Sequence, residues 1–226
     1  MPYLNGMTHS DPYPKYALAE RIADGVMHAA GVGFAITGTV FLLIWATATM
    51  DAGTIVGASV YGAALIASFV ASACYHFTPW ERLRPALRRI DHAAIYFKIA
   101  GTYTPLVVLI GSAFAYGVLT LVWVLAAIGA VAKLFFWGTR GGSGHMGTVL
   151  YLGLGWLSLA LITSLFPVVP TAGLVLLGVG GATYTVGAVI FSLEGLRYQN
   201  AIWHGFVLAA SVCFFAAIVI GMPQVA

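Results

Sequence analysis

Long apolar stretches dominate the chain and are separated by short polar connections. A membrane-spanning helix needs about 20 mostly apolar residues, and this rule predicts seven spans. None of the stretches shows the period-2 alternation that is typical of a membrane β-barrel. The predicted spans are 22–47, 54–77, 90–110, 114–137, 147–166, 172–193 and 200–220.

The predicted fold class is therefore an all-α membrane protein, a bundle of seven transmembrane helices in one domain. The connections are short and rich in Gly and Pro, as is typical of turns. We expect residues 1–21 to form a cytoplasmic N-terminal segment, 22–221 the transmembrane domain, and 222–226 a short C-terminal tail.

Composition supports a membrane protein and excludes two other classes. Of the 226 residues, 61% are hydrophobic and only 8% are charged, and the mean hydropathy is +0.95. A soluble domain has roughly 25% charged residues. This chain therefore has too few charged residues for its surface to be exposed to water on all sides. The net charge of +3 is not concentrated in a run of Lys and Arg, so we expect membrane lipids as partners and no nucleic acid.

The positions of Lys and Arg predict the orientation. With seven alternating spans, nine of the ten fall on one side, and the tenth, Lys98, lies inside the third span. The positive-inside rule then places the N-terminus in the cytoplasm and the C-terminus outside. The nine are Lys15, Arg21, Arg82, Arg84, Arg88, Arg89, Lys133, Arg140 and Arg197.

Polar residues gather at the cytoplasmic ends of four spans. Three pairs lie four residues apart, on one helix face each, and Asp91 and Lys98 are seven apart. Ionisable residues within a membrane are costly and indicate a functional site. The pairs are Asp24 and His28, Ser72 and His76, and Asn200 and His204.

We interpret His76 and His204 as members of one internal site. Two imidazoles facing a carboxylate are typical of a metal centre, and catalytic zinc commonly has three protein ligands and one water. For Asp24 and His92, the position near a helix end favours contact with headgroups and water.

Several motifs together resemble the hemolysin III family, the bacterial branch of the progestin and adipoQ receptor superfamily. The resemblance extends from Glu20 to about Ala217, with the motifs in order on the expected spans. The motifs are Glu20–His28, Ser72-Ala-Cys-Tyr-His76, Asp91-His-Ala-Ala-Ile-Tyr96, Ala100–Pro105 and Ala201-Ile-Trp-His204.

The resemblance implies a multi-pass protein of the bacterial inner membrane with a zinc site near its cytoplasmic face. It implies metal ligands at His76 and on the last span, with Ser72 and Asp91 beside the metal as catalytic residues. Relatives in the wider superfamily are ceramidase-like hydrolases, which implies attack of water on a lipid amide. The bacterial members are associated with haemolysis and membrane-lipid homeostasis.

Three positions depart from the family pattern. Asn200 replaces the first histidine of the last-span pair, Phe214 another histidine, and Lys98 an apolar residue. In one interpretation zinc is retained by His76, His204 and either Asp91 or His28. In the other, Lys98 paired with Asp91 replaces the charge of the metal, with no zinc bound.

Three functions follow from these interpretations. The first is a zinc-dependent hydrolase of a lipid amide. The second is a non-catalytic membrane sensor or regulator with a degenerate metal site. The third, a pore-forming cytolysin or transporter, is disfavoured because the outer halves of the spans hold mainly Leu, Val, Ala and Gly. The sequence does not specify the lipid or the oligomeric state.

Overall fold

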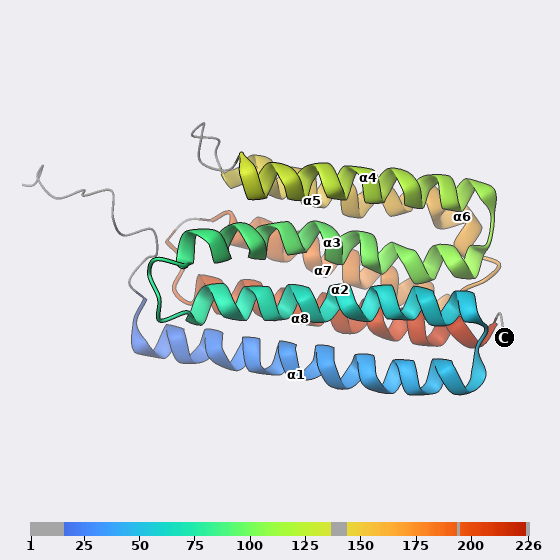
Figure 1. The fold of residues 1–226 in the computed structure, drawn as a ribbon, viewed down its shortest axis with the longest axis horizontal. Coiled ribbons are helices and arrows are strands. Elements are labelled where there is room, and N and C mark those ends of the chain that lie inside the picture. The colour runs from blue at the N-terminus through green and yellow to red at the C-terminus, as the bar shows by residue number, and fades with distance from the viewer. Residues whose placement is uncertain (1–15, 137–143, 194, 225–226) are drawn as a thin grey trace, which may run out of the picture.

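The computed structural model describes residues 16–136, 144–193 and 195–224, and within these ranges every regular element is a helix (Figure 1). The elements are α1 (Leu18–Thr49), α2 (Ala52–Phe77), α3 (Arg84–Ile110), α4 (Ala113–Phe135), α5 (Gly144–Trp156), η1 (Leu157–Leu161), α6 (Ile162–Leu165), α7 (Thr171–Phe191), α8 (Gln199–Gly221) and η2 (Met222–Gln224).

Six of these helices are long and apolar enough to cross a membrane: α1, α2, α3, α4, α7 and α8. They coincide with six of the predicted spans to within a few residues, except that the predicted end of the fourth, Trp137, lies outside the described residues. The chain is therefore a multi-pass helical membrane protein.

The segment predicted as the fifth span is not one continuous helix. It is divided into α5, the 3-10 helix η1 and the short α6 (Figure 1); α5 and η1 contact α4, and α6 contacts α3. The Tyr103 hydroxyl oxygen lies 2.8 Å from the carbonyl oxygens of both Leu154 and Gly155, which share its one proton, at the point where α5 gives way to η1. Because a side chain bonds these carbonyls, the α-helical pattern changes there.

Short, well-capped turns join the long helices. At the start of α2, Asp51 Oδ1 accepts from the backbone N–H of Gly53 and Thr54, at 2.7 and 3.2 Å. Gly111 follows the last residue of α3 and caps the helix with a φ of 66°, a conformation that glycine adopts at little cost. Because these connections are only a few residues long, consecutive helices lie next to each other and run in opposite directions.

The helices pack as a closed ring. Each of α1 to α4 packs against the next, α7 packs against α8, and α8 packs against α1. α2 and α3 approach each other closely at Gly101, where a Cβ would lie 2.6 Å from the Cβ of Ala64. The ring therefore brings the first and last membrane helices into contact.

One end of the bundle carries the described basic residues predicted to be cytoplasmic, and we call it the basic end. It contains the start of α1, the connection from α2 to α3, the end of α4 and the start of α8 (Figure 1). Arg84 ties this end together, because its guanidinium donates to the carbonyl oxygens of Tyr75 and Thr78 and to the Glu81 carboxylate. Lys15 and Arg140 lie outside the described residues.

Candidate metal centre and cavity

Three histidines from three helices meet at the basic end. His28 comes from α1, His76 from α2 and His204 from α8, and all three are buried; one nitrogen of each lies within 4.8 Å of the others. Their ring centroids are 4.1 to 5.1 Å apart. This is the only such group of His, Cys, Asp or Glu side chains within the ranges that the structure describes.

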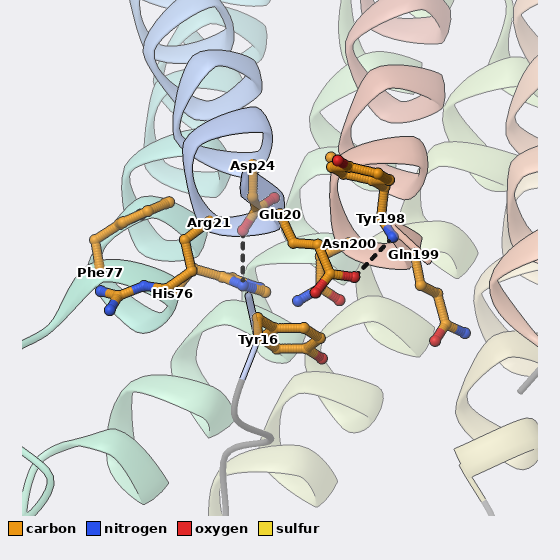
Figure 2. A pocket seen from close by; sticks show the side chains of 10 residues that line it. Tyr16, Glu20, Arg21, Asp24, His76, Phe77, Tyr198, Gln199 and Asn200 are labelled. Carbon is orange, nitrogen blue, oxygen red and sulfur yellow. Dashed lines mark hydrogen bonds and ion pairs between the residues drawn. The ribbon is translucent and has the colours of Figure 1, made fainter. Parts of the chain in front are cut away.

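Asp24 contacts the Nδ1 atom of each of the three imidazoles. Its side chain is buried, with Oδ1 accepting a 2.6 Å hydrogen bond from Nδ1 of His204 and Oδ2 lying 3.3 Å from Nδ1 of His76. Nδ1 of His28 lies 2.8 Å from the backbone oxygen of Asp24 and 3.5 Å from Oδ1. Figure 2 shows the Asp24–His76 contact.

This arrangement fixes which nitrogen of each ring can bind a ligand. An imidazole that donates from Nδ1 to a carboxylate or carbonyl presents an Nε2 lone pair on the other side. The Nε2 atoms of His28 and His204 both face the Ser72 hydroxyl, at 3.2 and 3.4 Å. Nε2 lone pairs from separate helices therefore converge near Ser72.

The donor set fits a zinc ion. Three neutral imidazoles are a common ligand set of catalytic zinc. Metal-binding histidines almost always donate their other N–H to a carboxylate or carbonyl, which orients the ring and raises its basicity. Asp24 makes this contact for each of His28, His76 and His204, so these three residues could hold a metal.

The structure brings together the predicted pair His76 and His204, and it adds His28 as the third member. Asp91, the other candidate ligand, is not part of the group; its carboxylate lies near His92, at 3.8 Å, and within hydrogen-bonding reach of Ser72. The catalytic roles of Asp91 and Ser72 stay predictions.

The expectation that Asp24 contacts headgroups and water is wrong. Asp24 is 4% exposed and lies at the centre of the cluster, because α8 covers the face of α1 that carries it. One sequence signal could have found it: Asp24 and His28 have the same spacing as Asn200 and His204, at the same predicted depth.

Asn200 does not join the three histidines. Its side chain lies within hydrogen-bonding reach of Tyr16, just before α1, and burial raises the pKa of the Tyr16 phenol. Tyr16, Asn200, Asp24 and His76 line a small hollow of about 10 Å³ at the basic end (Figure 2). That volume is close to the space that one water occupies.

A second, far larger cavity of about 640 Å³ runs into the bundle from the histidines. His28, Ser72, His76, Asp91 and His204 line it near the basic end. This volume lies within the range of about 300–1,000 Å³ that is usual for ligand pockets. The cavity therefore places a ligand-sized space beside the candidate metal centre.

Lys98 lines this cavity but does not pair with Asp91. Its Nζ lies 3.4 Å from the Tyr184 hydroxyl and 4.6 Å from the centroid of the Phe69 ring, and no ion pair within 4.0 Å joins it to Asp91. The expected Lys98–Asp91 pair is wrong because the lysine side chain extends toward α7, although both residues share a face of α3.

Comparisons with known proteins agree with these observations. The family model described as haemolysin-III related matches residues 16–215. The chain is 34% identical over 203 residues to a hemolysin-3 homolog of Bacillus subtilis (strain 168), covering 88% of this chain and 93% of the relative. It is 34% identical over 197 residues to hemolysin-3 of Bacillus cereus, covering 87% and 89% of the two chains. Over 180 residues it is 30% identical to the human monocyte to macrophage differentiation factor, covering 70% and 67%.

Proposed function

Because this chain belongs to the haemolysin-III-related family, we propose that it is a zinc-dependent hydrolase of the cell membrane that cleaves a lipid amide. The observation that carries the proposal is the contact of one buried carboxylate, Asp24, with the Nδ1 atoms of His28, His76 and His204. A purely structural cluster has no need for three imidazoles to share one carboxylate in this way.

The proposed topology has seven spans in the bacterial inner membrane. Besides the six long helices, the remaining crossing is the fifth predicted span, the segment Gly144–Leu165 of α5, η1 and α6, which contacts α3 and α4 (Figure 1). An odd number of crossings places the two termini on opposite sides, with the basic end in the cytoplasm. Reporter fusions to both termini test this; a C-terminal reporter active in the cytoplasm would contradict it.

In the proposed site, His28, His76 and His204 hold the zinc through Nε2. Zinc bound there supplies a Lewis acid and a water of lowered pKa. Asp24 keeps each imidazole in the Nδ1–H tautomer. The large cavity accommodates the acyl chain beside the histidines.

The remaining roles fall to Ser72 and Asp91. The Ser72 hydroxyl, between the Nε2 atoms of His28 and His204, donates to the amide carbonyl oxygen as negative charge develops there. Asp91 accepts a proton from the attacking water and returns it to the amine nitrogen. The new C–O bond and the broken C–N bond give a carboxylate and an amine.

Metal analysis of the full-length protein in lipid nanodiscs tests the metal centre. We expect about one zinc per chain, and much less in His76→Ala and His204→Ala. That result would also refute the alternative in which Lys98 replaces the metal. Wild-type protein that purifies without zinc and does not bind added zinc would contradict the proposal.

Hydrolysis is tested separately with a ceramide that carries an isotope-labelled acyl chain. We expect labelled fatty acid to form, to disappear on chelation and to return when zinc is added. Asp91→Asn and Ser72→Ala should slow its formation by about 100-fold or more, as is typical when a general base or an oxyanion donor is lost. Zinc-loaded protein that cleaves no lipid amide would contradict the hydrolase and favour a non-catalytic sensor or regulator.

A further inference from the structure

Lys98 is a buried basic side chain with no acidic partner in the described part of the chain. It lies seven residues beyond Asp91 on α3, about 10 Å deeper in the bundle, and it is 5% exposed. Its contacts are the Tyr184 hydroxyl at 3.4 Å and the faces of Phe69 and Tyr184 at 4.6 and 5.4 Å. No carboxylate lies within 4.0 Å of Nζ among the residues that the structure describes.

These contacts compensate only part of the cost of burying an ammonium group. An ammonium has three N–H donors, and the Tyr184 hydroxyl accepts one of them at a long distance. Aromatic faces attract a cation, but more weakly than an anion does. A charged lysine within a membrane is usually paired or faces a cavity, and Lys98 faces the cavity of about 640 Å³.

The cavity is basic at one end and apolar at the other. Its described lining includes three basic side chains, Arg88, Lys98 and Lys133, and one carboxylate, Asp91. Beyond Lys98, toward the end opposite the basic end, the wall is mainly apolar and contains several leucine side chains. They include Leu106, Leu161, Leu165, Leu174 and Leu177.

We propose that this cavity binds a single-chain lipid with one carboxylate, a long-chain fatty acid, whose carboxylate contacts Lys98 Nζ. The hydrocarbon chain lies along the leucine-lined wall, away from the three histidines. A carboxylate in the cavity would supply the acceptor oxygens that Phe69 and Tyr184 do not offer to the remaining N–H donors of Lys98. The subsite goes beyond the proposed hydrolase, because it needs no metal and lies deeper in the bundle than the histidines.

The consequence is that Lys98 determines the specificity of the cavity for an acidic lipid. With a neutral residue at position 98, the same leucine-lined wall accepts any apolar chain of similar length. With lysine, a fatty acid gains a charge-assisted hydrogen bond that the matching alcohol makes more weakly. The part of the difference between acid and alcohol that is lost when Lys98 is replaced therefore reports on this lysine.

Equilibrium binding of radiolabelled palmitate and hexadecanol to the full-length protein in nanodiscs of neutral lipid tests the subsite. We expect the wild type to bind palmitate about tenfold more tightly than hexadecanol, a difference of about 1.4 kcal/mol. Lys98→Met should remove this preference and leave hexadecanol binding unchanged, which also shows that the cavity is intact. Equal binding of the two lipids by the wild type, or an unchanged preference in Lys98→Met, would overturn the proposal.

Two further arms separate this subsite from other sources of binding. His76→Ala should keep the preference for palmitate, because the proposed carboxylate site does not include the metal centre. Loss of the preference in that variant would place the carboxylate at the histidines and overturn the proposal. Tighter binding of lysophosphatidate than of palmitate would also overturn it, since the site would then prefer a phosphate headgroup.

Discussion

Asp24, in the first membrane helix, accepts a 2.6 Å hydrogen bond from His204, in the last one. The same carboxylate approaches Nδ1 of His76 through its other oxygen. One side chain therefore sets the orientation of imidazoles on two other helices, because each of its two carboxylate oxygens faces an imidazole Nδ1 atom.

Asp24→Asn should weaken zinc binding by about 10- to 100-fold, which is the usual effect of losing a partner of metal-binding histidines. The amide has only one acceptor oxygen, so its NH₂ group faces either His76 or His204 and disfavours the Nδ1–H tautomer. Competition with a fluorescent zinc chelator measures the change. Glu20→Gln, one turn earlier on α1, is the matched control, and equal losses in the two variants would contradict the role of Asp24.

His28→Ala should lose zinc, whereas His92→Ala should retain it. His28 is a member of the three-histidine group, but Nδ1 of His92 contacts the backbone oxygen of Arg88 and lies outside the group. Zinc content per chain, measured by mass spectrometry after dialysis, distinguishes the two. If His92→Ala also lost its zinc, or His28→Ala kept a full complement, the three-histidine ligand set would be wrong.

Gly101→Ala should destabilise the bundle by about 1–3 kcal/mol, as overpacking of a tight interface typically does. The added Cβ would lie 2.6 Å from the Cβ of Ala64, and an alanine has no rotamer that moves this atom away. α2 and α3 must therefore separate. Unfolding in detergent measures the loss.

Gly33→Ala on α1 provides the control, because a Cβ there has nothing within 4 Å. Alanine is also the better helix former, by up to about 1 kcal/mol. A Gly33→Ala variant as unstable as Gly101→Ala would show that close packing is not the cause.

Asp51→Ala should lower the melting temperature at neutral pH, and the difference from the wild type should shrink in acid. The hydrogen bonds from Thr54 and Gly53 hold the pKa of the Asp51 carboxyl below its ordinary value. A carboxyl with a lowered pKa in the folded state stabilises above its ordinary pKa of about 3.9, and this stabilisation is lost as the pH falls through the lowered value.

Melting curves in detergent at pH 7, 4 and 2 test this dependence. Asp51→Asn does not titrate but can still accept from the helix N-terminus, so its melting temperature should approach that of the wild type as the pH falls. A difference between Asp51→Ala and the wild type that stayed constant well below the ordinary pKa would contradict the assigned cause.

The spans could be predicted from the sequence because the length of an apolar stretch decides whether it crosses a membrane. Six long helices follow the predicted ranges closely. The break at η1 could not be predicted, because it depends on Tyr103 reaching the carbonyl oxygens of Leu154 and Gly155 from a helix about 50 residues away.

Part of the candidate site was also accessible from the sequence. His76 and His204 lie at the same predicted depth, which indicated that their side chains share one site. The burial of Asp24, in contrast, depends on which face of α1 the last helix covers. The seven-residue spacing of Asp91 and Lys98 predicted a shared face correctly but not a contact. The lysine side chain is long enough to reach Tyr184 on α7. The spacing of residues along α3 does not show whether the side chain extends toward Asp91 or toward α7.

The origin of the three imidazoles on α1, α2 and α8 has a consequence for biosynthesis. During translation the first two helices leave the ribosome long before His204 is made, so an early intermediate has Asp24, His28 and His76 without their third partner. If the proposed zinc centre needs all three imidazoles, its metal binds only after the final helix is inserted, and a chain that is truncated before α8 lacks one ligand. Zinc content per chain would then report that synthesis reached the last helix.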